Sequence, residues 1–162
     1  MDGNLLKAVA LSISPLGESK VGIPVGLLSG NNNIYLVFIL CLIANILVFP
    51  LMLFFLTNIN KRLLRWNFYK TSAIYVARRA KNGSGKQIKK YGFWGLLIFV
   101  MIPLPGTGVY AGTIASYIYN IDKKKAFLAN TIGITLSAII IWTLTVFFKD
   151  FSFSEYFSSI IK

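Results

Sequence analysis

The sequence has no histidine, a single cysteine (Cys41) and only five acidic residues among its 162. These absences exclude Ser-His and Cys-His nucleophile pairs, the usual metal sites and any intramolecular disulfide. Charged residues are also scarce, because they make up 14% of the chain against about 25% in a soluble domain. With 56% hydrophobic residues, the chain has too little polar surface to cover a globule. The composition therefore indicates an integral membrane protein, with a length typical of one domain.

Four apolar blocks occupy most of the chain, at residues 5–30, 34–57, 92–119 and 126–148. Each reaches or exceeds the ~20 residues that a helix needs to cross a ~30 Å hydrocarbon core. A nucleic-acid-binding protein could share the pI of 10.0, but it would not carry four such runs. We therefore expect no nucleic-acid partner.

The second and fourth blocks have the pattern of ordinary transmembrane helices, since neither contains a charged residue. Each carries an amide, Asn45 or Asn130, that needs hydrogen-bond partners inside a membrane. Two roles have equal weight for each amide: packing between helices, or lining a substrate pathway.

The first and third blocks are interrupted by proline and glycine. The first interruption is expected between Ser14 and Gly26, and the second is Pro103-Leu104-Pro105-Gly106-Thr107-Gly108. Proline removes a backbone donor and glycine weakens a helix, so no continuous helix is expected in either block. Each half-block has only about 12 residues, or ~18 Å of helix, which passes the membrane midplane without crossing the bilayer. We therefore predict two re-entrant helical hairpins whose breaks face each other or a shared cavity.

The basic residues favour this topology. Ten lie between the second and third blocks, and three, Lys123, Lys124 and Lys125, lie between the third and fourth. All thirteen fall on one face only if the first and third blocks are re-entrant, and the positive-inside rule makes that face cytoplasmic. Four plain spans remain the alternative, because the group of ten could outweigh the group of three. We expect an integral protein of the plasma membrane.

The expected fold is all-α and forms a single membrane domain over residues 1–162. It consists of two inverted repeats, each a re-entrant hairpin (5–30 or 92–119) followed by a transmembrane helix (34–57 or 126–148). Inverted repeats with discontinuous helices are typical of secondary transporters, whose site lies at the repeat interface. Because each chain has only two full spans, we expect a homo-oligomer, with a dimer favoured, to shield the hairpins from lipid.

The polar interval 58–91 mixes basic and aromatic residues. This pattern suits an amphipathic cytoplasmic segment that lies on an anionic leaflet, which makes anionic lipid an expected partner. A basic loop that only sets the topology explains the charge equally well. The tail, 149–162, is expected to rest at the opposite interface.

Glu18 and Lys20 are the charged residues at the centre of an apolar block, where charge is expensive and indicates function by default. In one interpretation they neutralise each other and shape a turn. In the other, Lys20 binds an anion together with the glycine-rich turns, the hydroxyl of Thr107 and the amino ends of half-helices, while Glu18 couples binding to protons. The candidate binding or coupling residues are Glu18, Lys20, Pro24, Asn45, Pro103, Pro105, Gly106, Thr107, Gly108 and Asn130. We expect neither an enzyme nor a cofactor, because the blocks hold no acid pair, histidine or activated nucleophile.

Two stretches resemble motifs of the small multidrug export protein family. The first, 15–26, resembles that family's Pro…Glu-Leu-Arg-x-Ala-Ile-Pro-x-Gly pattern, with Ser19 in place of Leu and Lys20 in place of Arg. The second, 91–112, looks like the family's second signature almost residue for residue, including Ile102-Pro103-Leu104-Pro105-Gly106-Thr107-Gly108. Lys20 keeps the charge of the arginine but lacks the bidentate guanidinium that suits a phosphate.

The layout is also similar to the DedA/VTT superfamily. That resemblance implies the handling of lipids, such as recycling polyprenyl-phosphate carriers or scrambling phospholipids. The leading hypothesis is therefore transbilayer movement of an anionic amphiphile, a lipid or polyprenyl phosphate, with proton coupling through Glu18. The chief alternative is export of small, often cationic, compounds, with Glu18 as the counter-ion. A third hypothesis is a non-transporting membrane scaffold whose basic face recruits anionic lipid or protein.

Overall fold

The computed structural model describes residues 3–15, 17–29, 33–59, 88, 90–104 and 107–150. Within these ranges the chain is helical and contains no strand, which confirms the all-α prediction. The helices are α1 (Gly3–Ile13), α2 (Glu18–Leu28), α3 (Ile34–Phe54), the π-helical turn η1 (Phe55–Ile59), α7 (Phe93–Met101), α8 (Val109–Ile118) and α9 (Lys123–Asp150). The predictions for the basic interval and for the tail fall almost entirely outside the described residues.

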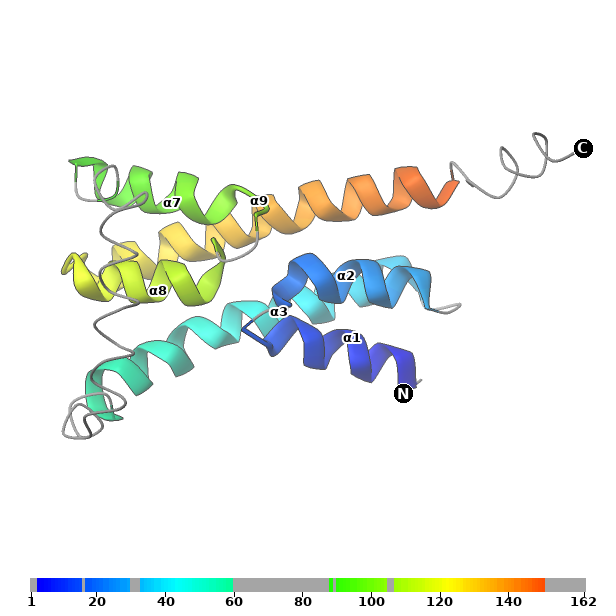
Figure 1. Ribbon diagram of the computed structural model, residues 1–162, viewed down its shortest axis with the longest axis horizontal. Helices are drawn as coiled ribbons and strands as arrows, with labels where there is room; N and C mark the ends of the chain where they lie inside the picture. The colour runs from blue at the N-terminus through cyan, green and yellow to red at the C-terminus, as the bar shows by residue number, and fades with distance from the viewer. Residues whose placement is uncertain are drawn as a thin grey trace, which may run out of the picture.

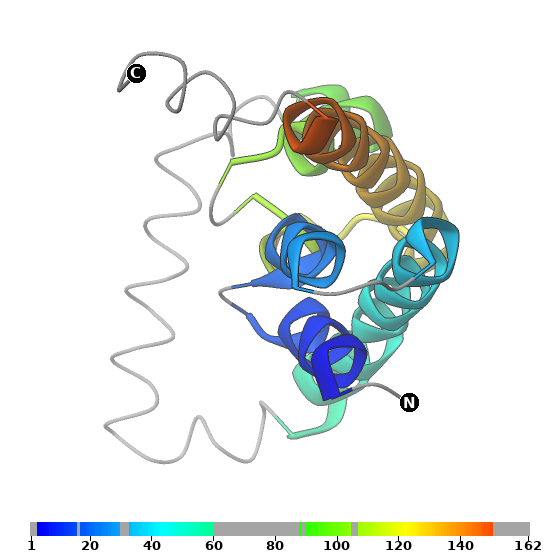
Figure 2. The same ribbon diagram turned by 90° about the vertical axis from the view of Figure 1, so that its right-hand side faces the viewer.

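In the described part of the chain, two long helices, α3 and α9, run in opposite directions, and four short helices lie beside them (Figure 1). The first helix pair, α1 and α2, occupies one end, and the second helix pair, α7 and α8, occupies the other. Viewed end-on, α3 and α9 form one layer, with α1, α2 and α8 against it (Figure 2). The break within each pair therefore lies near the middle of the molecule.

The two halves of the chain pack by the same pattern. In each half the first short helix contacts its partner and the long helix that follows: α1 contacts α2 and α3, and α7 contacts α8 and α9. The second short helix also contacts the long helix of the other half, α2 with α9 and α8 with α3. Each pair has its own apolar cluster, which includes Ile23 and Val37 at one end and Leu96 and Val100 at the other.

The long helices are apolar and begin at side-chain caps. The Asn33 side chain accepts a hydrogen bond from the Tyr35 N–H at 3.0 Å, and Asp122 accepts from the N–H groups of Lys124 and Lys125 at 3.1 and 3.2 Å. Residues 34–58 and 123–148 are long and apolar enough to cross a membrane, with mean hydropathies of 2.9 and 2.0. The two predicted spans are therefore present as candidate membrane-spanning helices.

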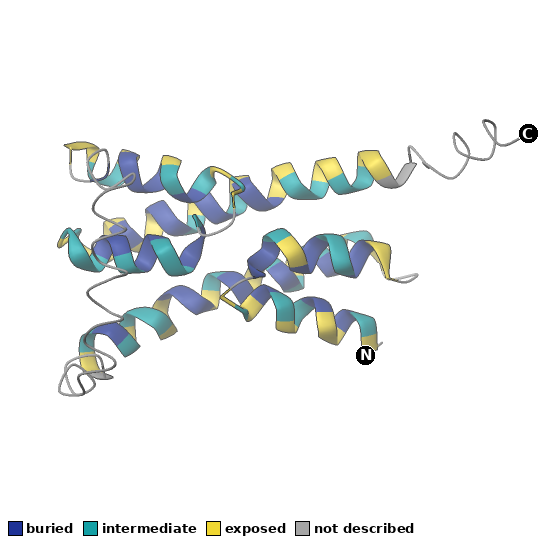
Figure 3. Ribbon diagram, viewed as in Figure 1, coloured by how far each residue is buried: buried dark blue, intermediate teal, exposed yellow. Residues whose placement is uncertain are grey.

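Both long helices carry exposed residues along their length (Figure 3), and many of these residues are large and apolar. Leu51 on α3 is 66% exposed and Leu128 on α9 is 53% exposed. Water disfavours apolar surface on this scale, whereas a lipid environment covers it without cost. The exposed surface thus agrees with the composition in favouring a membrane environment.

The first break is shorter than expected. It lies between the end of α1 at Ile13 and the start of α2 at Glu18, and α2 continues through Pro24 to Leu28. Gly22 and Gly26 belong to the helix and allow close packing: a Cβ on Gly22 would overlap the Ser12 side chain, and one on Gly26 would lie 2.9 Å from the Ala8 Cβ. The prediction of a break extending to Gly26 was wrong, because these glycines serve helix contact rather than a turn.

The second break separates α7, which ends at Met101, from α8, which begins at Val109. Its central residues Pro105 and Gly106 lie outside the described part of the chain. The four short helices have 9 to 11 residues each, or about 14–17 Å at 1.5 Å per residue. None of them is long enough to cross a ~30 Å hydrocarbon core by itself.

Candidate functional site

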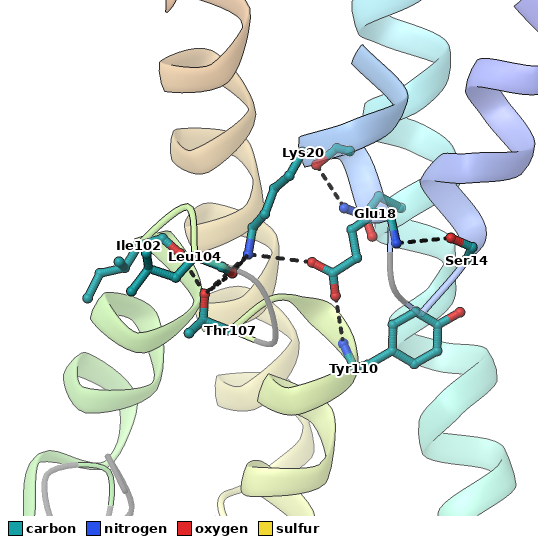
Figure 4. Close-up of polar contacts among 10 residues, drawn as sticks. Ser14, Glu18, Lys20, Ile102, Leu104, Thr107 and Tyr110 are labelled. Atoms are coloured by element: carbon teal, nitrogen blue, oxygen red, sulfur yellow. Dashed lines mark hydrogen bonds and ion pairs between the residues drawn. The ribbon is translucent and has the colours of Figure 1, made fainter. Parts of the chain in front are cut away.

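Lys20 joins the two breaks. It lies in the first turn of α2, and its ammonium donates hydrogen bonds to the Leu104 carbonyl oxygen at 2.9 Å and to the Thr107 hydroxyl oxygen at 3.2 Å (Figure 4). Both acceptors belong to the second break, more than 80 residues away along the chain. The breaks therefore face each other, as the sequence predicts.

Glu18 lies beside Lys20 and faces α8. Its Oε2 atom is 3.6 Å from the Lys20 ammonium, and its Oε1 atom accepts a long hydrogen bond of 3.5 Å from the backbone N–H of Tyr110. The two charged side chains are only 8% and 12% exposed, respectively. A carboxylate at the amino end of a helix is stabilised by the unpaired N–H groups and by the helix dipole.

Gly108 makes room for this carboxylate. It precedes α8, and a Cβ at this position would overlap the carboxylate of Glu18. Glycine is needed here for close approach rather than for an unusual backbone angle, since its φ is −93°. We refer to Glu18, Lys20, Leu104, Thr107, Gly108 and the Tyr110 N–H as the Glu18–Lys20 site.

Thr107 holds the second break in shape as well as contacting Lys20. Its hydroxyl lies 2.7 Å from the Ile102 carbonyl oxygen and 2.8 Å from that of Leu104, so it donates its one proton to this pair of acceptors. The same oxygen accepts from Lys20. Thr107 therefore fixes both the local turn and the position of the ammonium.

Sequence reasoning missed two residues that support the site. Tyr110 donates a hydrogen bond from its hydroxyl to the Ile13 carbonyl oxygen at the end of α1, which ties the second pair to the first. Ser14 accepts from the Gly17 N–H at 3.0 Å through its hydroxyl, and its carbonyl accepts from the Glu18 N–H at 3.1 Å. The signal for Tyr110 was its place in the second motif, two residues after Gly108.

The two buried amides have different positions. Asn45 lies at the edge of the site, because its Nδ2 donates to the Ser19 hydroxyl at 2.9 Å and Ser19 lies between Glu18 and Lys20. Asn130 donates to the Ala126 carbonyl of its own helix at 2.8 Å, and it packs so closely on Gly112 that a Cβ there would overlap it. Asn130 therefore contacts its own helix and α8.

The other predicted residues surround the site or fall outside it. Pro24 lies one turn after Lys20 inside α2, and Pro103 lies in the second break. Pro105 and Gly106 are outside the described residues. The site as a whole holds one positive and one negative charge, both on α2, against polar groups of the second helix pair. Glu18 and Lys20 contact each other, which is the arrangement that the interpretation of mutual neutralisation requires.

The chain was compared with known proteins. No curated protein and no solved structure matches it. Residues 18–140 match the family described as "Putative small multi-drug export protein". The match begins at Glu18 and includes α2, α3, α7, α8 and most of α9, so it contains every described residue of the Glu18–Lys20 site. The wider likeness to the DedA/VTT superfamily stays a prediction. Since the match covers well over half of its length, the chain belongs to the small multi-drug export protein family.

Proposed function

We propose that the protein is a membrane transporter built as an inverted repeat. In this proposal α3 and α9 span the bilayer, and the helix pairs α1–α2 and α7–α8 are re-entrant hairpins that enter from opposite faces. The lengths of the short helices, the packing pattern shared by the two halves and the export role in the family's description support it. The Glu18–Lys20 site would then lie near the membrane midplane, where such transporters bind their substrates.

The substrate we propose is an anionic amphiphile, a lipid or polyprenyl phosphate. The observation that carries this proposal is the position of the Glu18 carboxylate, an anion held between the Lys20 ammonium and the amino end of α8. A phosphate oxygen offers the same chemistry and could replace it. The contacts of 3.6 and 3.5 Å exceed the ~2.7–2.9 Å of a strong charge-assisted hydrogen bond. The carboxylate is therefore held loosely enough to exchange.

Exchange of the Glu18 carboxylate for a substrate headgroup would couple substrate binding to protonation of Glu18. When Glu18 takes up a proton it loses its charge, and the Lys20 ammonium and the α8 amino end become available to a headgroup. Release of the headgroup and loss of the Glu18 proton to water would let the ionised carboxylate return. Since Lys20 and the Tyr110 N–H belong to different halves, binding and release would also change the contact between the halves. The site therefore offers a route to alternating access through rigid helix pairs.

The proposal is tested by transport in proteoliposomes with Lys20→Gln. Loss of movement of a fluorescent or radiolabelled lipid phosphate is the expected result, because glutamine keeps a polar end on the side chain but not its charge. Lys20→Arg is the matched control and should retain transport, since the charge remains. Unchanged lipid movement by the folded Lys20→Gln protein would overturn the substrate assignment.

A second candidate, export of small cationic compounds, is favoured by the family's description. Glu18 would be the counter-ion, and the ammonium of Lys20 would occupy the place of a substrate cation, bound by the carboxylate and by the Leu104 carbonyl. This candidate makes the opposite prediction for Lys20→Gln, because removing the competing ammonium should leave cation export unchanged or improve it. The same variant therefore separates the two functions.

The scaffold hypothesis is separated by a different set of variants. A scaffold would tolerate both Glu18→Gln and Lys20→Gln, whereas removal of the positive charges between Lys61 and Lys81 would abolish its interactions. In a transporter, Glu18→Gln and Lys20→Gln would impair substrate movement, whereas removal of the charges between Lys61 and Lys81 would have the smaller effect. Recruitment of anionic vesicles and substrate movement, measured on the same variants, give the two readouts.

A further inference from the structure

A groove lies between the end of α3 and the start of α9, away from the Glu18–Lys20 site. Its volume is about 770 Å³, within the ~300–1,000 Å³ of typical small-molecule sites. Apolar and aromatic side chains form most of it, including Phe49, Leu53, Phe54 and Phe127, and Lys123 and Lys124 also line it. A second cavity of about 510 Å³ shares Leu53 and both lysines and extends along the end of α8.

The apolar part of the groove combines a packed floor with open walls. Phe49 is 2% exposed and meets Phe127 edge to face, with 5.6 Å between the ring centroids. Phe54 is 59% exposed, Leu128 is 53% exposed, and both line the groove. Such a surface suits a flexible hydrocarbon chain, which can lie along the aromatic floor while remaining continuous with surrounding lipid.

The polar end of the groove carries positive charge. Lys123 and Lys124 are exposed, and among the residues that the structure describes neither has an ion-pair partner. The nearby acid, Asp122, accepts hydrogen bonds from the backbone N–H groups of Lys124 and Lys125. Its carboxylate therefore caps the amino end of α9, the helix that begins with these lysines. Both lysines lie at the end of a candidate membrane span, the depth at which lipid headgroups are found.

We propose that this groove binds an anionic phospholipid, whose phosphate lies between Lys123 and Lys124 and one of whose acyl chains lies along Phe54, Phe127 and Leu128. Charge complementarity selects this occupant, because an apolar channel that ends in two unpaired ammonium groups matches an acyl chain that ends in a phosphate. The site is independent of the Glu18–Lys20 site and does not require transport. Its polar and apolar parts make separate contributions that can be removed one at a time.

The test is a lipid titration of the full chain in dodecyl maltoside, read by native mass spectrometry. Dioleoylphosphatidylglycerol is the anionic probe and dioleoylphosphatidylcholine the zwitterionic one. We expect phosphatidylglycerol to bind more tightly, with a loss of about fivefold for each lysine replaced by glutamine and roughly 25-fold for Lys123→Gln/Lys124→Gln. Glycerol 3-phosphate should not displace the lipid at millimolar concentration, since it lacks the chains.

The matched control is Lys7→Gln/Lys125→Gln, which removes the same charge from two exposed lysines that do not line the groove. This control should keep most of the affinity for phosphatidylglycerol. Leu53→Trp, which fills the groove and leaves the lysines in place, should weaken binding of both lipids. Helicity and a monodisperse elution profile establish that each variant is folded.

Three results would overturn the proposal. Equal affinity of the unmodified chain for the two lipids would remove the headgroup preference. Equal losses in the groove and control variants would indicate attraction by diffuse charge rather than by a site. Binding of phosphatidylglycerol to monomers but not to dimers in the same spectra would make the groove an interface between copies of the chain.

Discussion

The ammonium of Lys20 lies 2.9 Å from the carbonyl oxygen of Leu104, and this contact joins the two helix pairs at their breaks. Glu18, two residues earlier, faces the N–H of Tyr110 in the second pair. Each half of the chain thus supplies partners for the other at the centre of the molecule. Substitutions here test stability and function together, because the same atoms hold the halves in contact and form the candidate binding site.

The first prediction concerns the energy of the Glu18–Lys20 pair. Lys20→Met leaves the buried Glu18 carboxylate without its partner, and breaking such a pair costs about 3–5 kcal/mol. Glu18→Gln/Lys20→Met removes both charges and should be less destabilising than Lys20→Met alone. Unfolding by a denaturing detergent, followed by circular dichroism, measures the four members of the cycle. A coupling energy of about 1–3 kcal/mol is expected, and strict additivity of the two substitutions would contradict the contact.

The second prediction concerns Gly108. A Cβ at this position would overlap the Glu18 carboxylate, so Gly108→Ala should displace that carboxylate from the amino end of α8. Transport in proteoliposomes should fall by about tenfold or more, because small misplacements of a binding group are costly. Gly3→Ala is the control, since a Cβ there meets nothing within 4 Å. Equal activities of the two alanine variants would show that the close approach of Gly108 has no functional role.

Much of the fold could be predicted from the sequence because a helix that crosses a lipid bilayer needs a long uninterrupted run of apolar residues. Uninterrupted apolar runs gave the two long helices to within a few residues, and the Pro103–Gly108 motif gave the second break. The first break was predicted to be too long. Glycine occurs both in turns and in tight contacts between helices, so the sequence alone does not show which role Gly22 and Gly26 have. Only tertiary packing against Ser12 and Ala8 separates these cases.

The candidate site was predictable in its charges but not in its contacts. Glu18 and Lys20 were identified because each is a charged residue inside an apolar block, where burying a charge costs free energy. The acceptors of Lys20 include a backbone carbonyl, and the donor to Glu18 is a backbone N–H, groups that every residue has. Sequence therefore cannot indicate which carbonyl or which N–H will be used. The role of Tyr110 depends in the same way on the carbonyl of Ile13, which is distant along the chain.

The third prediction concerns topology. Ser29 and Asn120 are exposed residues at the far ends of the two helix pairs, and Figure 1 shows those ends on opposite sides of the molecule. On a Cys41→Ala background, single cysteines at these positions should react with a membrane-impermeant maleimide from opposite sides of the membrane. Cys41 itself is buried and should react slowly in the unmodified chain. Labelling of both positions from the same side would exclude the re-entrant arrangement.

The fourth prediction concerns oligomeric state. The short helices cannot cross the bilayer alone, and α1 and α7 expose Leu6 (60%) and Trp94 (65%). We propose that a second copy of the chain helps to cover the hairpins, with a dimer as the smallest assembly. Native mass spectrometry from nanodiscs, or single-molecule photobleaching in liposomes, should report two copies. A monodisperse monomer in a native-like bilayer would contradict this assembly.

The last prediction concerns pH. The proposed exchange frees Lys20 and the α8 amino end when Glu18 is protonated, so headgroup binding should strengthen as pH falls. A single linked proton changes the binding constant by up to about tenfold per pH unit across its titration. Glu18→Gln imitates the protonated side chain and should bind the headgroup at every pH with no such slope. Affinity for a short-chain lipid phosphate, measured by calorimetry over a range of pH on both proteins, gives the comparison. The same slope in the glutamine variant would assign the proton to another group, whereas a slope of opposite sign in the unmodified protein would favour cation export, because a cation needs the ionised carboxylate.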